Sequence, residues 1–534
     1  MDRGEWFEKI AMGSLPERAA ARWGGREALA FNGRRWTFAE LSAGVDRVAK
    51  GLIALGIEPG ERVALWMLNR AEWIEAAYAA MKIGAILLPV NTRFRTADVT
   101  YVLEQSESAT LLLADRSGPV EYLEMVREVA PSLPHLRRMV ALAETARTGA
   151  IRWEAMLAGG AAVSDADLAA RARAVDPGAI AFLMYTSGTT GFPKGVMHDH
   201  RMVRNIVDGG NRMGITFADA IMMYLPLFHL FGFAEGLLMS MVTGARQVLT
   251  EGFDPDESLD LIQTERATVI HGFDLHYKAL LEAQEKKPRD VSSVRTGILA
   301  SGMSSSWPIA REGRRVFGPM LSGYGMSEFG VGVALSFLDS TEEQCVEASG
   351  YPAPGYEIRV IDPDTGRDQP AGVPGEILVG GYTVMRGYWN KPVETARTID
   401  DRGFVHTGDM GVLRADGHLR FMGRYKDMLK IGGENVDPME VEAYLMGHPA
   451  INLAAVVAYP DPKLSEVGVA YIRLEPGATL TEADVLEFCR GKIASFKIPR
   501  RVFFVGELPM TSSGKIQKVR LREDAVTRQP PATR

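Results

Sequence analysis

Cysteine is almost absent from this chain of 534 residues, which contains only Cys345 and Cys489. Two cysteines this far apart form no metal-ligand pattern and no disulfide framework, so they fit a reducing cytoplasm or have no special role. The N-terminus lacks a basic segment that leads into an apolar one, and we therefore predict a cytoplasmic protein without a secretion signal. The net charge of −7 gives no electrostatic basis for binding nucleic acid.

A long uninterrupted apolar run is also missing. The most apolar window, residues 222–242, is long enough to span a membrane, but polar and helix-breaking residues interrupt it (Pro226, His229, Gly232, Glu235 and Gly236). We therefore predict no transmembrane segment and interpret this window as a buried wall of a globular domain. Peripheral contact with a membrane and formation of a homodimer both stay open.

The chain has no Walker phosphate-binding motif, which requires Gly-Lys followed by Ser or Thr. Residues 185–195 nevertheless contain four Ser or Thr residues, three glycines and Lys194, directly after an apolar run at 179–185. Glycine lets main-chain N–H groups approach an anion, hydroxyl groups donate hydrogen bonds, and lysine adds a positive charge. This composition favours a phosphate-binding loop over an ordinary polar loop between a strand and a helix.

The first two thirds of the sequence predict layered α/β structure. Thr37 and Glu40 form a capping box ahead of apolar residues spaced three and four apart, which indicates an amphipathic helix. Short apolar runs at 62–67 and 85–90 flank another helix, and the same alternation returns between 177 and 330. Strands that alternate with helices are typical of parallel sheets, so we predict two layered α/β subdomains.

The pattern of apolar runs and turn residues changes near residue 350. Glycine and proline turns punctuate short strand-like runs at 357–361 and 376–379, which predicts a small β-barrel or sheet. After Arg424, further runs at 453–458 and 468–474 indicate an independent α+β domain of about 110 residues, a usual domain size.

Several motifs follow one another in a set order along the chain. They are residues 185–195, Pro226-Leu-Phe-His229, Tyr324-Gly-Met-Ser-Glu328, Gly375-Glu-Ile with Arg386-Gly-Tyr-Trp-Asn, His406-Thr-Gly-Asp409, Gly423-Arg-Tyr-Lys-Asp427 with Gly432-Gly433, and Ser513-Gly-Lys515. In this order, and over nearly its whole length, the chain resembles the adenylate-forming superfamily, in particular acyl-CoA synthetases of the AMP-dependent fatty acid–CoA ligase type. The resemblance implies an N-terminal ATP- and acyl-binding domain at 1–423, a hinge at 424–427 and a mobile C-terminal domain at 428–534.

The resemblance also implies a reaction in two halves that uses ATP, Mg²⁺ and CoA. A carboxylate attacks the α-phosphorus of ATP to give an acyl adenylate and pyrophosphate, and the CoA thiol then displaces AMP. The first half brings two anions together, so it needs charge neutralisation and alignment more than a protein nucleophile. The expected acid is a fatty acid or a related carbon-chain or alicyclic acid.

The resemblance assigns the nucleotide to specific residues. Thr186 and Lys194 belong to the catalytic set, and Glu328 holds Mg²⁺, which one carboxylate and phosphate oxygens commonly bind. Asp409 only accepts hydrogen bonds and suits two ribose hydroxyls, with Arg424 near the sugar or a phosphate. By themselves, Glu328 could be a solvated acid and Asp409 half of a surface ion pair. The other implied nucleotide-binding residues are Ser187, Gly188, Thr189, Thr190, Gly191, Ser301, Gly302, Met303, Tyr324, Gly325 and Ser327, where Ser-Gly-Met-Ser replaces the usual Gly-Gly-Ala-Pro.

Lys515 matches the lysine that bridges the attacking carboxylate and the nucleotide during adenylation. In the family, the C-terminal domain rotates about a residue that matches Lys426. That rotation withdraws Lys515 and presents Lys430, Gly432 and Gly433 to the pantetheine arm of CoA. Without the resemblance, an exposed lysine is usually only soluble surface, and the glycine pair is equally well a plain turn.

The acyl pocket implied by the resemblance includes Phe228, His229, Phe233, His271, Phe273 and Asp274. A lone histidine on an apolar wall is more often a satisfied core residue than a catalyst, so His229 is assigned to substrate binding only. Gly272-Phe273-Asp274-Leu275 replaces a Gly-Val-Pro-Thr type sequence of the family, and the polar His271 and Asp274 lie near an otherwise apolar pocket. They either recognise a polar or ring-bearing acyl group or belong to a hydrogen-bonded scaffold.

Two other activities share almost every motif. An acyl-AMP ligase would load a carrier protein in place of CoA, and an aryl-CoA ligase would differ only in its pocket. An amino-acid-adenylating domain is less consistent with the sequence, because Phe228-His229 stands where such domains usually place an aspartate. Nothing in the chain specifies the oxygen chemistry of a luciferase, and a non-enzymatic nucleotide-binding module would not be expected to keep Glu328 and Lys515 together.

Overall fold

The computed structural model describes residues 8–117, 120–143, 149–186, 193–301, 303, 306–431, 434–490, 492–511 and 516–528. A first seven-stranded sheet is parallel except for its last strand, β9, which runs antiparallel to β8. Its strands, in spatial order, are β7 (Ile151–Arg152), β6 (Arg138–Leu142), β5 (Thr110–Ala114), β3 (Arg62–Trp66), β4 (Ile86–Pro89), β8 (Ile180–Thr186) and β9 (Lys194–Asp199).

A second seven-stranded sheet has the same design, with one antiparallel edge strand, β2. Its order is β14 (Met320–Leu321), β13 (Thr296–Ala300), β12 (Val269–Phe273), β10 (Ala220–Met223), β11 (Arg246–Leu249), β1 (Glu27–Phe31) and β2 (Arg34–Thr37). The hairpin β1–β2 comes from the start of the chain and pairs with β11, so the two α/β units are interleaved in sequence.

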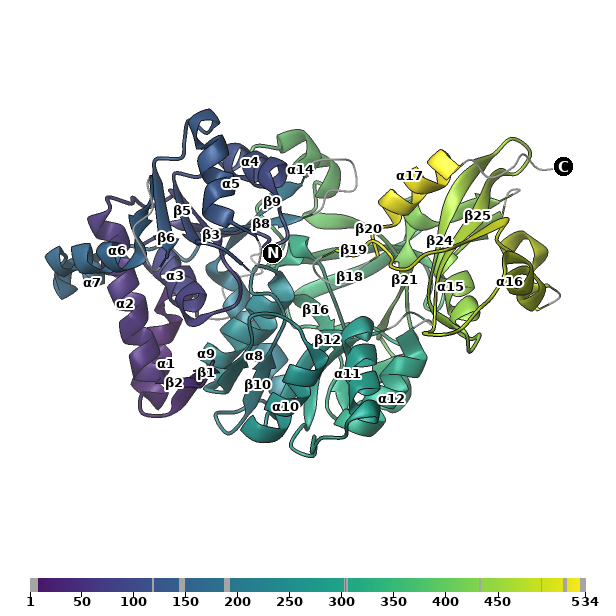
Figure 1. Ribbon diagram of the computed structural model, residues 1–534, viewed down its shortest axis with the longest axis horizontal. Coiled ribbons are helices and arrows are strands. Elements are labelled where there is room, and N and C mark those ends of the chain that lie inside the picture. Colours follow the sequence, from purple (N-terminus) through teal and green to yellow (C-terminus); the bar gives the residue numbers. More distant parts are fainter. Residues whose placement is uncertain are drawn as a thin grey trace.

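Helices cover both sheets (Figure 1). Helix α2 begins after the predicted capping box, in which Thr37 accepts from the N–H of Glu40 and Glu40 accepts in return. The helices of the large domain are α1 (Leu15–Trp23), α2 (Phe38–Ala54), α3 (Ala71–Lys82), α4 (Thr96–Gln105), α5 (Tyr122–Val129), α6 (Trp153–Gly159), α7 (Asp165–Arg173), α8 (Val203–Arg212), the π-helix η5 (Phe231–Leu238), α9 (Met239–Thr243), α10 (Pro255–Glu265), α11 (Asp274–Lys286), α12 (Trp307–Phe317), α13 (Glu342–Val346) and α14 (Pro392–Thr398). Short 3₁₀ turns are η1 (Met12–Ser14), η2 (Ala130–Ser132), η3 (Gly160–Ala162), η4 (His200–Met202) and η7 (Ser327–Phe329).

One hydrophobic core joins the two large sheets. Helix α3 is buried along its whole length, and Trp73 and Tyr78 have no exposed surface. The Tyr78 hydroxyl donates to the carbonyl of Leu237 in η5 at 3.2 Å, which links α3 to the predicted buried wall of residues 222–242. No helix among the described residues is long and apolar enough to cross a membrane.

Two smaller sheets follow, as the glycine and proline turns predicted. Strands β15 (Gly323–Gly325), β16 (Gly332–Leu335) and β17 (Tyr351–Pro352) form a three-stranded antiparallel sheet. Strands β18 (Tyr356–Ile361), β19 (Gly375–Gly381), β20 (Phe404–Leu413) and β21 (Leu419–Arg424) form the barrel-like antiparallel sheet.

The C-terminal part has its own sheet and its own core, to one side of the large domain (Figure 1). The sheet contains β22 (Leu429–Ile431), β23 (Glu434–Val436), β24 (Ile451–Asp461), β25 (Ser465–Leu474) and β26 (Arg501–Phe504). Its helices are α15 (Pro438–Met446), α16 (Glu482–Cys489) and α17 (Lys518–Arg528), and the turns are η8 (Tyr425–Asp427) and η9 (Ser495–Lys497). The predicted hinge at 424–427 falls between β21, in one sheet, and β22, in the next. The predicted fold class, a large two-subdomain α/β domain with a small α+β domain, is confirmed.

Candidate active site

The predicted phosphate loop connects two antiparallel strands of the first sheet. Thr186 ends β8 and Lys194 begins β9, and the two residues are paired in register. The loop residues Ser187, Gly188, Thr189, Thr190 and Gly191 lie outside the described residues. The Lys194 ammonium lies 4.1 Å from the ring centroid of Tyr388, a cation–π contact that holds a positive charge at the base of the loop.

Tyr388 also reaches Glu328, the predicted Mg²⁺ ligand. Glu328 lies in η7, is 8% exposed, and its Oε1 accepts a hydrogen bond from the Tyr388 hydroxyl at 2.7 Å. Main-chain bonds hold the same segments, because the N–H of Met385 donates to the Glu328 carbonyl at 2.8 Å and that of Trp389 donates to the Gly195 carbonyl at 2.8 Å. Burial, reinforced by the Glu328 charge, raises the pKa of Tyr388 so that its hydroxyl stays protonated and can donate.

Sequence reasoning included Tyr388 in a motif but gave it no role. The signal was its place in Arg386-Gly-Tyr-Trp-Asn, but only tertiary contacts show that this tyrosine joins Lys194 to Glu328. The observed cluster is therefore Lys194, Tyr388 and Glu328.

Tyr388→Phe is expected to lower the rate of adenylate formation roughly tenfold, because the ring under Lys194 stays while the hydrogen bond to the Glu328 carboxylate is lost. Pyrophosphate release should also need more Mg²⁺ for half-maximal rate. Tyr356→Phe is the matched control, since the buried Tyr356 hydroxyl bonds Thr383 at 2.7 Å, away from this cluster. Equal changes in both variants would show that Tyr388 only contributes to packing.

A second buried cluster lies where β15, β20 and β21 meet. The Tyr324 hydroxyl donates to Asp409 Oδ2 at 2.7 Å, and Arg424 Nε lies 3.0 Å from Asp409 Oδ1. The register of β20 and β21 places Asp409 directly opposite Arg424. Burial, together with the Asp409 charge, raises the pKa of Tyr324 well above its ordinary value, so the hydroxyl remains a donor.

The charge on Arg424 is also secured by its surroundings. Burial by itself would lower the Arg424 pKa, but the charges of Asp409 and Asp427 outweigh it and raise the pKa. Asp409 is 3% exposed, so its carboxylate is held in a fixed place between a tyrosine and an arginine. Three of the predicted nucleotide-binding residues are thus brought together.

The other predicted nucleotide-binding residues differ in how far they are exposed and in their contacts. Ser301 follows β13 and is buried, and its hydroxyl donates to the Cys345 carbonyl at 2.9 Å, which gives it a scaffold contact. Gly325 is exposed in β15, and Met303 is partly exposed. The carbonyl of Ser327 lies 2.6 Å from His198 Nε2, and burial lowers the pKa of His198 to about 4. Gly302 lies outside the described residues.

The predicted acyl-binding residues lie on η5 and β12 and on the segments beside them. Phe228 is buried and its ring lies 4.6 Å from that of the partly exposed His229. Phe233 is fully buried, 5.2 Å from Phe182, within the shared core. Phe273 ends β12 and packs edge-to-face on Phe231 at 5.2 Å.

The sequence allowed two roles for His271 and Asp274, either recognition of the acyl group or a place in a hydrogen-bonded scaffold. In the structure the two residues have different surroundings. Asp274 begins α11, and its Oδ2 accepts from the Ser306 hydroxyl at 2.9 Å, just ahead of α12. That contact favours a scaffold role for Asp274. His271 is 2% exposed in β12, and burial lowers its pKa to about 4, so the imidazole is neutral.

Hydrogen bonds connect the C-terminal part to the large domain. Arg93 Nη1, in the loop after β4, donates to the carbonyl of Thr511 at 3.2 Å, and Lys278 Nζ in α11 donates to the carbonyl of Asn452 at 2.6 Å. Thr511 is four residues from Lys515, which lies outside the described residues together with Gly432 and Gly433. The side chains of Lys426 and Lys430, in η8 and β22, are likewise not described.

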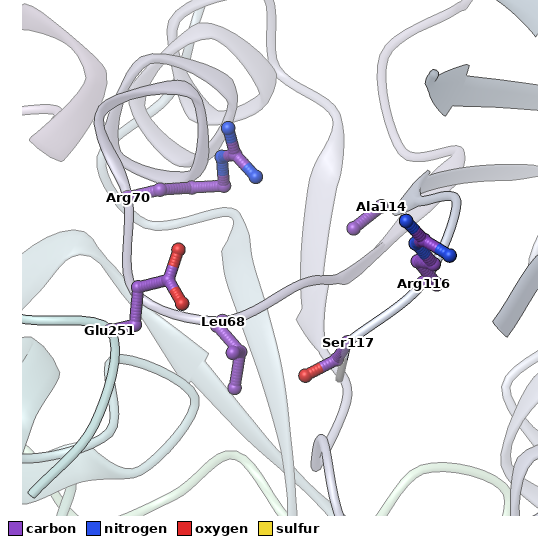
Figure 2. Close-up of a pocket in the computed structure, with 6 residues that line it drawn as sticks. All are labelled: Leu68, Arg70, Ala114, Arg116, Ser117 and Glu251. Carbon is purple, nitrogen blue, oxygen red and sulfur yellow. The ribbon is translucent and has the colours of Figure 1, made fainter. Parts of the chain in front are cut away.

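A cavity of about 490 Å³ lies at the ends of β3, β5 and β11. Figure 2 shows Arg70 and Glu251 on one side of it, with Arg116 and Ser117 on the other. Arg70 Nε is paired with Glu72 at 2.8 Å, so the lining carries charges of both signs. None of the predicted site residues lines this cavity.

Glu328 is the carboxylate predicted to hold a metal. In the ranges that the structure describes, no three His, Cys, Asp or Glu side chains gather as a metal site. Within those ranges Tyr388 is the only donor to the Glu328 carboxylate, which leaves Oε2 for another partner. One carboxylate oxygen fits Mg²⁺ bound chiefly by water and substrate phosphates.

Comparison with known proteins identifies the family. The family model "AMP-binding enzyme" matches residues 16–389, and "AMP-binding enzyme C-terminal domain" matches residues 440–515. The chain belongs to the AMP-binding enzyme family. Like the acyl-CoA synthetases it resembles, this AMP-binding enzyme is an AMP-forming acyl-CoA ligase, which confirms the predicted activity.

Three relatives illustrate the range of the family. The 3-[(3aS,4S,7aS)-7a-methyl-1,5-dioxo-octahydro-1H-inden-4-yl]propanoyl:CoA ligase of Rhodococcus jostii is 34% identical, over 96% of this chain and 98% of its own. The anthranilate CoA ligase AuaEII in complex with anthranoyl-AMP has a TM-score of 0.88 at 28% identity, over 99% of both chains. ATP-bound MatB from Rhodopseudomonas palustris has a TM-score of 0.84 at 29% identity, over 96% of this chain and 99% of its own.

Proposed function

We propose that this acyl-CoA ligase acts on a fatty acid or a related carbon-chain or alicyclic acid and works in two half-reactions. In the first, an oxygen of the acid attacks the α-phosphorus of ATP, the bond to the β-phosphate breaks, and pyrophosphate leaves. In the second, the CoA sulfur attacks the acyl carbon and AMP leaves. The observation that carries the proposal is the cluster of Lys194, Tyr388 and Glu328 at the base of the phosphate loop.

The residues divide the work of the first half-reaction. Lys194 neutralises phosphate charge, with Ser187, Thr189 and Thr190 as further donors. Tyr324, Asp409 and Arg424 hold the ribose end of the nucleotide, and the ATP-bound MatB structure supports ATP as that nucleotide. Bound Mg²⁺ would neutralise the phosphates, and Glu328 would hold it while Tyr388 fixes the carboxylate.

Lys515 completes the site in the first half-reaction. The contact of Arg93 with the Thr511 carbonyl holds Thr511, four residues before Lys515, against the large domain. For the second half-reaction, rotation about Lys426 would remove Lys515 and bring Lys430, Gly432 and Gly433 toward CoA. A rigid-body rotation of one domain needs only a few residues to change their main-chain angles, which a four-residue hinge at 424–427 can supply.

The names of the relatives support more than one class of acid. The Rhodococcus jostii ligase acts on a propanoate that carries a fused ring system, which supports the alicyclic class. The anthranilate CoA ligase supports an aryl acid as the second candidate, because its chain aligns over 99% of this one.

Pyrophosphate release with a panel of carboxylic acids tests the proposal. The panel contains octanoate, cyclohexanepropanoate and benzoate, each with CoA, with a phosphopantetheinylated carrier protein, or with neither acceptor. We expect thioester formation only when CoA is added, and a higher kcat/KM for the chain or alicyclic acid than for benzoate. Thioester formation on the carrier protein only would overturn the CoA assignment, and preference for benzoate would make the enzyme an aryl-CoA ligase.

A further inference from the structure

The predicted acyl-pocket wall contains a buried acid whose carboxyl group is incompletely paired. Glu235 lies on the π-helix η5, shortly after Phe228 and His229, and is 7% exposed. The main-chain N–H of Gly332 donates toward the carboxyl group, but Oε2 has no hydrogen-bond partner among the described residues. π-Helices are rare and often accompany functional sites, so an unpaired carboxyl oxygen on one needs a functional explanation.

Glycines leave space around this carboxyl group. A Cβ at Gly332 would lie 3.8 Å from Glu235 Oε1, and a Cβ at Gly209 of α8 would lie 3.6 Å from Oε2. Gly332 begins β16 and pairs with Gly325 of β15, one of the predicted nucleotide-binding residues. The carboxyl group of Glu235 is therefore connected through one strand pair to the segment that carries Tyr324 and Glu328.

His271 supplies a second, incompletely paired group beside the same helix. Its Nδ1 accepts a hydrogen bond from the N–H of Ile298 at 3.1 Å, so in the neutral imidazole the proton is on Nε2. Nε2 makes no hydrogen bond of normal geometry within the described ranges and reaches the main-chain carbonyl of Glu235 only weakly. The ring lies 6.0 Å from Phe231 and next to the main-chain carbonyl of Glu235, which places it against η5.

Two other buried acids of this enzyme are each paired with a cation. Glu442 Oε1 lies 2.6 Å from Lys518 Nζ, and Asp219 Oδ2 lies 2.6 Å from Arg295 Nη2. Glu235 forms no ion pair within the described part of the chain, and burial raises its carboxyl pKa to about 7. A carboxyl group with that pKa donates or accepts a hydrogen bond near neutral pH.

Leaving buried polar groups incompletely paired lowers the stability of the folded protein. A ligand that pairs with them recovers this loss, and a ligand that cannot pair with them does not. This is the arrangement by which a site accepts a substrate that carries an oxygen and rejects the analogue that lacks it.

We propose that Glu235 and His271 form a polar end of the acyl pocket, where they bind a keto or hydroxyl oxygen on the acyl group, remote from the reacting carboxylate. The inference rests on the proposed function and specifies its substrate class as oxygenated acids. A keto oxygen would accept from His271 Nε2–H and from the protonated Glu235 carboxyl group. A hydroxyl group would donate to Glu235 Oε2.

Matched acids test the proposal directly. Octanoate is compared with 7-oxooctanoate and 7-hydroxyoctanoate, and cyclohexanepropanoate with its 4-oxo and 4-hydroxy derivatives, by the kcat/KM for pyrophosphate release with CoA present. We expect the full-length enzyme to prefer at least one oxygenated acid over its parent by about 10–100-fold. Glu235→Leu and His271→Leu should each lower that ratio about tenfold or more, and Glu235→Gln should retain most of it.

Thermal unfolding distinguishes a role of Glu235 in substrate recognition from a role in stabilising the fold. Without substrate, Glu235→Leu should keep or raise the Tm, because an apolar side chain replaces a buried group that lacks a partner. Gln247→Leu is the control: Gln247 Oε1 is buried without a partner in β11, outside the predicted acyl-binding set, and its loss should not change the ratio.

Several results would overturn the inference. They are equal kcat/KM values for every matched pair, a ratio unchanged in both leucine variants, or a Tm that falls by several degrees in Glu235→Leu. These leave the proposed function intact as long as the parent acids are converted to CoA thioesters. No thioester from any acid would overturn the proposed function, and this inference with it.

Discussion

Lys515→Ala is expected to lower the rate of acyl adenylate formation by about 10²–10³-fold, while thioester formation from a supplied acyl adenylate and CoA stays within a few-fold of the wild-type rate. The lysine is predicted to neutralise charge where the attacking carboxylate and the α-phosphate approach each other. That charge builds up only in the first half-reaction. After adenylation, the same lysine would occupy the path of the thiol.

The contact between Arg93 and the Thr511 carbonyl gives this prediction its structural basis, because it holds the chain four residues before Lys515 against the large domain. Each half-reaction is measured separately, the first by ATP–pyrophosphate exchange and the second by thioester formation from synthetic acyl adenylate. Lys492→Ala, at an exposed lysine of the same domain, is the control and should change neither rate. An equal loss of both half-reactions in Lys515→Ala would contradict rotation of the C-terminal domain.

The layered fold was predictable because its signals are local. The Thr37–Glu40 capping box and the apolar runs that became β3, β4, β8 and β13 depend on neighbouring residues, and the structure places them as expected. The pairing of β1 with β11 was not predictable in this way, since it joins residues more than two hundred positions apart. The π-helix η5 was also missed, because its apolar sequence does not distinguish an α-helix from a π-helix.

For the candidate site, too, local sequence signals were predictive and long-range contacts were not. Motifs indicated Glu328, Asp409, Arg424 and Lys194 by their order, but not what each side chain contacts. The bonds of Tyr388 to Glu328 and of Tyr324 to Asp409 join residues 60 and 85 positions apart. The unpaired oxygen of Glu235 was equally hidden, since sequence gives no account of which buried polar groups find partners.

Glu328→Gln is expected to reduce adenylate formation by about 10²–10³-fold with little change in fold. The amide has the same shape and its oxygen can still accept from Tyr388, but it carries no charge for the proposed Mg²⁺. The loss should therefore exceed the roughly tenfold effect of Tyr388→Phe, which keeps the carboxylate and removes only its positioning bond.

The Mg²⁺ dependence of ATP–pyrophosphate exchange distinguishes these roles. In Tyr388→Phe, added Mg²⁺ should restore most of the rate, because the ligand is present but less well oriented. In Glu328→Gln, added Mg²⁺ should restore little, while thioester formation from supplied acyl adenylate continues, since pyrophosphate is absent from that step. Glu312→Gln, at an exposed acid paired with Arg315, serves as the charge control. If Glu328→Gln lost both half-reactions and its Tm fell, Glu328 would be a structural carboxylate, and the metal would have to be held by the phosphates and the loop alone.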